Sequence, residues 1–93
     1  FMDPKNRNLT STFFKRGNRL EYVKPGAKFR HIHADRTIET ASVLGVYADG
    51  FGIPHVRYKV VMKRPHVEGY EDGPRSLALK TFFEHFEERA GTA

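Results

Sequence analysis

The sequence predicts a mainly β domain, in which a small curved sheet or barrel is closed by a short C-terminal α-helix. Residues 37–62 hold two runs rich in Val, Ile, Tyr and Thr on either side of a Gly, Asp and Pro cluster, which is the pattern of a β-hairpin. Near the C-terminus an apolar stripe recurs at helical spacing: Leu79, Phe82, Phe83 and Phe86. The chain has only 93 residues, so the hairpin and the helix belong to one domain.

The composition along the chain sets the expected domain boundaries. Residues 1–12 are polar and have no hydrophobic period, so we expect a flexible lead-in, a single domain over residues 13–90 and a tail over residues 91–93. The chain contains no cysteine, no signal-peptide pattern and no apolar stretch of the ~20 residues that cross a bilayer. We therefore expect a cytoplasmic protein that has no disulfide and does not bind a membrane.

The N-terminal part of the domain is expected to contain two strands joined by a tight turn. The first strand is expected over residues 19–23 and the second over residues 28–33, with Phe29 in the core. Pro25 and Gly26 form the turn between them, because Pro presets φ and Gly adopts the positive φ that other residues resist.

The long hairpin follows, and its two strands differ in pattern. The first is apolar on both faces over residues 43–47, so we expect it to bend at Gly45 and to cover each face in turn. Strict alternation places Tyr47 on the face of Glu39 and Val43, and Val46 on the opposite face. The second strand alternates between a core face and a polar face. The core face holds Val56, Tyr58, Val60 and Met62, and the polar face holds His55, Arg57 and Lys59.

The C-terminal third is expected to contain a loop, a short strand and the helix. Residues 64–74 hold two Pro and two Gly and are expected to form a loop, and residues 75–79 a strand. Thr81 and Glu84 match a capping box, in which each side chain satisfies a backbone N–H at the start of a helix. The sequence therefore predicts a helix over residues 82–89.

This order of elements resembles that of the SH3-like small β-barrels. The stretch over residues 23–29, in which a Pro-Gly turn precedes a basic and aromatic strand, is similar to the opening of several of them. The hairpin that carries Asp49 and Gly50 is similar to their central strands, and the likeness covers roughly residues 19–89. The resemblance implies a binding module for nucleic acid, peptides or modified side chains, although one fold hosts many functions.

The positive charge of the chain is concentrated near its N-terminus. The net charge is +5, and residues 1–30 alone carry +6. Basic and aromatic residues occur together over residues 13–16 and 28–31, a pattern that suits nucleic acid if the rings are exposed. Core positions for Phe13 and Phe14, or a solvated basic arm, would explain the same pattern without a nucleic acid.

Aromatic residues also favour a protein or peptide partner. Phe51 lies between two glycines at the tip of the long hairpin, where a large side chain is hard to bury. Exposed tyrosines could line a groove for an extended peptide, and a sheet edge could pair with a second copy of the chain. The candidate partner-binding residues are Arg30, His31, His33, Phe51, His55, Arg57 and Lys59.

Metal and catalytic chemistry have weaker support. His31 and His33 share a strand face about 7 Å apart, but a third ligand such as His55, Asp35 or Glu39 would be needed. His66 and His85, in a loop and a helix, have no matching partners in the sequence. The adjacent carboxylates at residues 71–72 lie in a Gly/Pro stretch and are typical of a turn.

We therefore expect no metal, no cofactor and no enzyme activity. The sequence favours a non-catalytic module that binds a protein or peptide, with nucleic-acid binding as the alternative.

Overall fold

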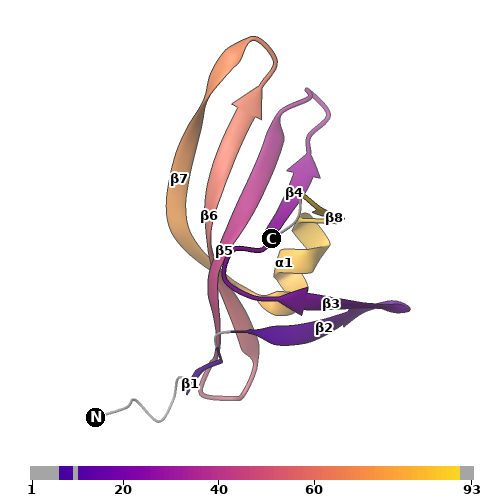
Figure 1. Cartoon of the computed structure of the whole chain (residues 1–93), viewed down its shortest axis with the longest axis vertical. Helices are drawn as coiled ribbons and strands as arrows, with labels where there is room; N and C mark the ends of the chain where they lie inside the picture. The colour runs from indigo at the N-terminus through magenta and orange to yellow at the C-terminus, as the bar shows by residue number, and fades with distance from the viewer. Residues whose placement is uncertain (1–6, 10, 91–93) are drawn as a thin grey trace.

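The computed structural model describes residues 7–9 and 11–90, which form eight strands and one helix (Figure 1). In chain order these are β1 (Arg7–Asn8), β2 (Thr12–Arg16), β3 (Arg19–Val23), β4 (Lys28–Ile32), β5 (Ile38–Ala48), β6 (Pro54–Arg64), β7 (Val67–Ala78), α1 (Leu79–His85) and β8 (Glu88–Arg89). The protein is mainly β, with a short helix near the C-terminus, as the sequence predicts. Over the described ranges, no helix has the length and apolar character that crossing a bilayer requires.

Two antiparallel sheets organise the strands. The larger has the order β7-β6-β5-β4-β8, and β1 pairs with the last two residues of β5. The smaller is the β2–β3 hairpin, which crosses in front of the larger sheet near α1 (Figure 1). The predicted strand over residues 19–23, the turn at Pro25 and Gly26 and the long hairpin are all confirmed.

A β-bulge bends β5 where the sequence predicts a bend. The pairing of β5 with β6 shifts register between Val43 and Gly45, and strict alternation of the strand faces breaks there. Val46 is consequently buried and Tyr47 is only half-buried, so the expectation that Tyr47 shares a face with Val43 is wrong. Two further strands pair with β5 on either side of the bulge. β4 pairs with the part of β5 before the bulge, and β1 pairs with the part after it.

The core lies between the larger sheet and α1. The largest fully buried side chains include Phe29 of β4 and Phe82 and Phe86 from the helical stripe. The rings of Phe29 and Phe82 meet edge to face at 5.7 Å, and Tyr58 meets Phe82 at 5.1 Å. The predicted apolar stripe is therefore confirmed as the contact between helix and sheet.

The predicted helix boundaries and the capping box are wrong. The helix begins at Leu79 after Ala78, and no side chain caps its first turn, so Thr81 lies inside the helix. It ends at His85, and residues 88–89 extend to pair with β4 as β8. Burial of Leu79 against the sheet explains the earlier start, because packing of an apolar face outweighs a local capping signal.

The predicted loop over residues 64–74 is also wrong. Only Pro65 and His66 form a turn, and β7 runs on from Val67 to Ala78 beside β6. Gly73 and Pro74 are accommodated at a bulge opposite Lys59, where Pro needs no ladder N–H. Gly73 has a φ of 147°, and a Cβ there would lie 3.0 Å from the backbone of Lys59, so this position favours glycine.

Regular structure begins earlier in the chain than the lead-in over residues 1–12 would suggest. Residues 7–8 form β1 because their backbone pairs with the end of β5, and β2 begins at Thr12. Residues 1–6, residue 10 and the predicted tail over residues 91–93 lie outside the described part of the chain.

Candidate functional site

The seven candidate residues fall in three separate places. Arg30, Arg57 and Lys59 lie on the sheet face opposite α1, Phe51 and His55 lie at the tip of the β5–β6 hairpin, and His31 and His33 lie on the helix side. The structure does not bring all seven together. Each place must therefore be judged as a site of its own.

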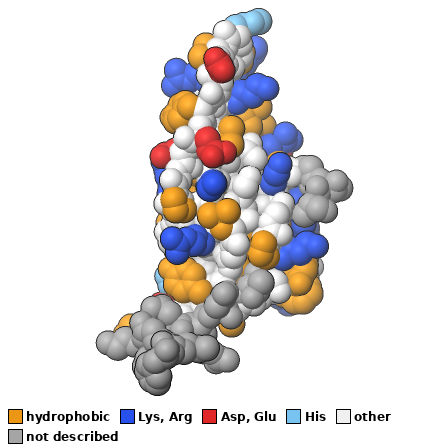
Figure 2. All heavy atoms as spheres, turned by 60° about the vertical axis from the view of Figure 1, so that its left-hand side comes forward, with side chains coloured by type: hydrophobic (Ala, Val, Ile, Leu, Met, Phe, Trp, Pro, Cys, Tyr) orange, Lys and Arg blue, Asp and Glu red, His pale blue; other side chains and the backbone are white. Residues whose placement is uncertain are grey.

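The first place is a cationic face made by Lys28, Arg30, Arg57 and Lys59. Lys28 and Lys59 lie in one row across β4, β5 and β6, because both are in register with Ser42. Arg30 forms an ion pair with Glu88 at 3.0 Å, whereas Lys28, Arg57 and Lys59 form none within the described chain. Figure 2, which brings the β7 side of the molecule forward, shows many Lys and Arg side chains with hydrophobic ones between them and few acidic ones.

The second place is the hairpin tip. The Phe51 side chain is 91% exposed, as the sequence predicts. The Asp49 carboxylate accepts hydrogen bonds from the backbone N–H groups of Ile53 and Phe51 at 3.0 and 2.8 Å, and these bonds lower the pKa of Asp49. The ring of His55 stacks on the ring of Tyr47, with 5.3 Å between the ring centroids. One face of the His55 ring is therefore covered and cannot contact a partner.

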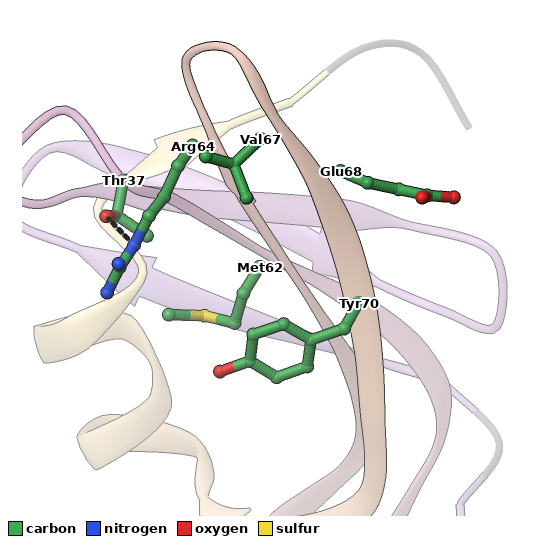
Figure 3. Close-up of a pocket in the computed structure, with 6 residues that line it drawn as sticks. All are labelled: Thr37, Met62, Arg64, Val67, Glu68 and Tyr70. Carbon is green, nitrogen blue, oxygen red and sulfur yellow. Dashed lines mark hydrogen bonds between the residues drawn. The ribbon is translucent and has the colours of Figure 1, made fainter.

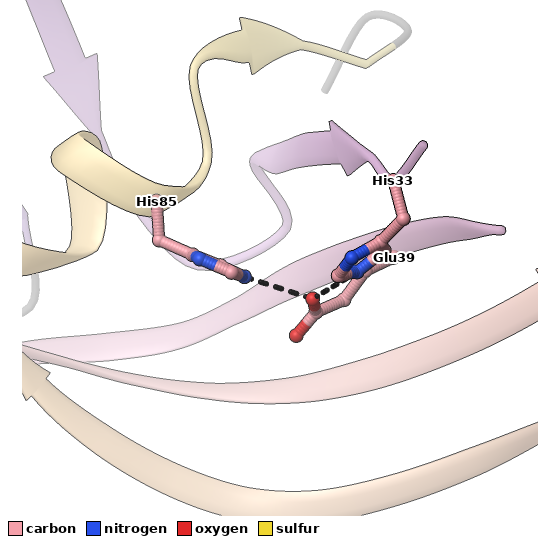
Figure 4. Close-up of side chains that lie close together, drawn as sticks. All are labelled: His33, Glu39 and His85. Atoms are coloured by element: carbon pink, nitrogen blue, oxygen red, sulfur yellow. Dashed lines mark hydrogen bonds and ion pairs between the residues drawn. The ribbon is translucent and has the colours of Figure 1, made fainter. Parts of the chain in front are cut away.

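The third place is a cluster that we call the His–Glu cluster: His33, Glu39 and His85 (Figure 4). His33 follows β4, Glu39 lies on β5 and His85 is the last residue of α1. The Nε2 atoms of His33 and His85 lie 3.0 and 2.8 Å from the same Oε1 atom of Glu39. The expectation that His85 lacks a partner is therefore wrong, because folding brings residues 39 and 85 together.

Glu39 is the centre of the cluster and is buried, with 7% of its surface exposed. Burial alone would raise the pKa of Glu39, but hydrogen bonds and charge from His85 and His33 outweigh it, and the pKa lies below its usual value. The ring of His31 lies 4.5 Å from that of His33 and 4.6 Å from that of His85. Two imidazoles thus contact one buried carboxylate, and a third imidazole packs against both of them.

A hollow in the sheet surface lies beside the His–Glu cluster. One part of about 450 Å³ is lined by His33, Ala34, Asp35, Thr37, Met62 and Arg64. A second part of about 180 Å³ extends from β6 onto β7, where Val67, Glu68 and Tyr70 line it (Figure 3). Arg64 donates a hydrogen bond from Nε to the Thr37 hydroxyl at 3.2 Å. The larger part of the hollow is open to solvent, and His33 forms part of its lining.

A further surface was not among the predicted site residues. One face of the β2–β3 hairpin exposes three large apolar side chains, with exposed fractions of 59% for Phe13, 66% for Leu20 and 38% for Tyr22. Lys15 lies opposite Leu20, and the Lys24 amine lies 6.0 Å from the Tyr22 ring, so two cations flank these side chains. We call this surface the hairpin face. In β3, the exposed residues Leu20 and Tyr22 alternate with the buried residues Glu21 and Val23. This alternation is the sequence signal that could have indicated the hairpin face.

No family model, curated protein or solved structure matches this chain. The function must therefore be argued from the geometry of these surfaces. Of the four, the hairpin face has the largest set of exposed apolar side chains in register, and the His–Glu cluster has the most specific arrangement of functional groups.

Proposed function

We propose that this protein is a non-catalytic interaction module that binds another protein through the hairpin face. The observation that carries the proposal is the exposure of Phe13, Leu20 and Tyr22 on one face of a two-stranded sheet. Contiguous exposed apolar side chains, with charged residues around them, mark protein interaction sites, and Phe and Tyr are enriched in such sites.

The chemistry of the hairpin face favours an acidic protein partner. Lys15 and Lys24 flank the apolar side chains and form no ion pair within the described chain. A partner with an apolar centre and an acidic rim would match both features. A second copy would bring the same two lysines to a two-fold interface and would offer no acidic residue of this face to pair with them, so self-association through this face is disfavoured.

The side chains themselves favour protein over single-stranded nucleic acid at this face. Leu20 is the most exposed of the three and has no ring on which a base could stack. The rings of Phe13 and Tyr22 contact each other at 4.7 Å and are tilted by 37°, so each covers part of the other. An apolar protein side chain can fill such an uneven surface better than a flat base.

The SH3-like architecture is part of the same proposal. Two features support it: the bend of β5 at its bulge and the helix packed on one side of the sheet. Over the described residues β7 pairs with β6 alone and β8 with β4 alone, so the larger sheet is open there. We propose an open relative of the SH3-like barrels rather than a closed barrel.

Nucleic-acid binding at the cationic face is the second candidate function. Lys28 and Lys59 lie in one row across three strands, Arg57 is two residues from Lys59, and none of the three is neutralised by an ion pair within the described chain. Unpaired cations on a sheet suit phosphates, and such contacts weaken steeply as salt rises. This face lies on a different sheet from the hairpin face, so variants separate the two functions.

The test is a quantitative capture experiment with immobilised protein and nuclease-treated cell extract. The variant Phe13→Ala/Leu20→Ala is compared with Phe51→Ala, which removes a still more exposed ring elsewhere, and with Arg57→Ala/Lys59→Ala. We expect the first variant to lose a captured protein by at least about tenfold, because truncation of central apolar contacts costs about 1.4 kcal/mol or more. The two control variants should retain it.

Two outcomes would overturn the proposal. If Phe13→Ala/Leu20→Ala captures the same proteins as the wild type, the hairpin face is not the site. If capture depends on intact nucleic acid and is lost in Arg57→Ala/Lys59→Ala, the cationic face is the functional surface. Anisotropy of labelled RNA and DNA at low and high salt then measures that second function directly.

A further inference from the structure

The His–Glu cluster combines ligand atoms that proteins use for transition metals. His33 and His85 present imidazole Nε2 atoms and Glu39 presents a carboxylate oxygen, and all three atoms lie within 4.8 Å of one another. Two imidazoles and one carboxylate bind Zn²⁺ or similar borderline divalent ions, and catalytic zinc sites use three protein ligands with a fourth position open. We propose that His33, Glu39 and His85 form a binding site for a divalent transition-metal ion such as Zn²⁺.

The ligand atoms can enclose an ion once the side chains adjust. Bonds of about 2.0–2.1 Å at tetrahedral angles place ligand atoms about 3.3 Å apart. The two Nε2 atoms lie 3.0 and 2.8 Å from Oε1 of Glu39, so each of these contacts would lengthen by a few tenths of an ångström. The two Nε2 atoms, which lie within 4.8 Å of each other, would also have to come to about 3.3 Å. In Figure 4 the rings of His33 and His85 approach the same Glu39 oxygen from two sides, so all three ligand atoms are directed at one region.

The charge of the cluster favours a cation. Glu39 is buried, and a buried carboxylate is costly without a compensating charge. A divalent ion would take the place of the two hydrogen bonds to Glu39 and put a positive charge beside the buried carboxylate.

The surroundings hold the ligands in place and leave one side accessible. Glu39 is fixed in the central strand of the sheet, and the buried rings of Phe82 and Phe86 fix the helix that ends at His85. His33 also lines the larger hollow, so a water molecule or a small ligand can reach the fourth position. The site would therefore bind an exchangeable ligand as well as link α1 to β5.

His31 would act as a neighbour of the site and not as a required ligand. Its ring lies within 4.6 Å of the rings of both proposed imidazole ligands, and its Nδ1 atom lies 3.7 Å from a carboxylate oxygen of Glu87. Groups of this kind orient ligands and tune metal sites from outside the coordination sphere.

The test uses the full chain without an affinity tag, after chelator treatment. Titration with Co²⁺, followed by its visible absorption, and competition with Zn²⁺ should give one site per chain. Mg²⁺ should not compete, because it prefers an all-oxygen site. Histidine ring NMR on the wild type should show Zn²⁺-dependent shifts for His33 and His85 and none for His66, which lies at the β6–β7 turn.

Variants then assign the ligands. His85→Ala and His33→Ala should each weaken Zn²⁺ binding by at least about tenfold, since even second-shell changes cost 10–100-fold. His66→Asn is the matched control and should bind Zn²⁺ like the wild type. Equal affinity in His85→Ala and wild type, no shift at His33 and His85 on Zn²⁺ addition, or an equal loss in His66→Asn would overturn the proposal. None of these readouts depends on the hairpin face.

Discussion

At the scale of single residues, the side chain of Glu21 connects more strands than the side chain of any predicted partner-binding residue does. Its carboxylate accepts a hydrogen bond from Arg16 at 2.7 Å and one from Arg19, and it lies 3.4 Å from Arg89 of β8. Arg16 also donates to the backbone oxygen of Glu87 at 2.9 Å. One buried anion thus ties the β2–β3 hairpin to the C-terminal segment.

Because of this network, we expect the free energy of unfolding to decrease at acid pH. Burial would raise the pKa of Glu21, but the hydrogen bonds and charges of Arg16 and Arg19 outweigh it and lower the pKa in the folded state. A lowered folded-state pKa contributes stability that is present above the unfolded pKa of about 4.3 and lost as pH falls through the folded value. Glu21→Gln should therefore reduce the free energy of unfolding by about 1–3 kcal/mol at neutral pH.

Urea unfolding at a series of pH values, followed by circular dichroism, measures the effect. The loss of stability between about pH 5 and pH 3 should be smaller in Glu21→Gln than in the wild type. Glu84→Gln, on the exposed side of α1, is the matched control and should keep the wild-type pH dependence. An unchanged pH profile in Glu21→Gln would show that the network does not contribute in solution.

At the scale of elements, α1 is held by its side chains and not by its own helical tendency. It has seven residues and no side-chain cap, and isolated helices of that length are unstable in water. Its stability comes from burial of Leu79, Phe82 and Phe83, together with Phe86 directly after its last residue. The helix and the sheet therefore depend on one another.

Phe82→Ala should be among the most destabilising single changes. Phe82 is fully buried and contacts the rings of Phe29 and Tyr58, so its removal leaves a cavity at the helix–sheet contact. The expected loss is about 3–5 kcal/mol in the free energy of unfolding. Phe51→Ala, at a 91% exposed position, should change it by less than about 0.5 kcal/mol. Similar losses in both variants would contradict the assigned core.

The elements show what local sequence can and cannot predict. The strand over residues 19–23, the turn at Gly26 and the alternation of β6 were predictable because each has a local cause in φ preference or period. The continuation of β7 through Gly73 and Pro74 was not predictable, because a bulge opposite β6 accommodates both residues. The capping signal at Thr81 was overridden by packing of Leu79.

The same distinction applies to the sites. Exposure of Phe51 and the pairing of His31 with His33 on one strand face followed from local pattern. The contact of His85 with Glu39 joins residues 46 positions apart and arises only when α1 packs on β5. The sequence analysis expected no metal because His31 and His33 alone are a weak signal and no third ligand could be assigned from sequence, and no observation tests that expectation.

At the scale of the whole molecule, the protein consists of two sheets joined by side chains. The β2–β3 hairpin shares no strand pairing with the larger sheet within the described residues. Phe14 anchors it by stacking on Phe83 at 4.9 Å, and Arg16 lies 4.8 Å above the same ring. A two-stranded sheet is marginal on its own, so the presentation of the hairpin face depends on this anchor.

The hairpin should therefore open more easily than the rest of the fold, and Phe14 should control that opening. Phe14→Ala removes the stacked ring at a cost of roughly 1–3 kcal/mol. We expect the backbone amides of β2 and β3 to exchange with deuterium at least about tenfold faster, since 1.4 kcal/mol is a factor of ten. Amides of β5 and β6, which pair over eleven-residue strands, should remain protected.

Hydrogen exchange at neutral pH, resolved by residue, separates this view from a single cooperative unit. Phe13→Ala is the matched control, because Phe13 lies next to the anchor but on the exposed face of the hairpin. It should cost no more than the ~1 kcal/mol of a cross-strand pair with Tyr22. If Phe14→Ala accelerates exchange equally in both sheets, the hairpin is part of one cooperative unit and the binding surface is as rigid as the core. If it accelerates β2 and β3 alone, the hairpin face is a locally mobile surface whose presentation depends on the Phe14–Phe83 contact.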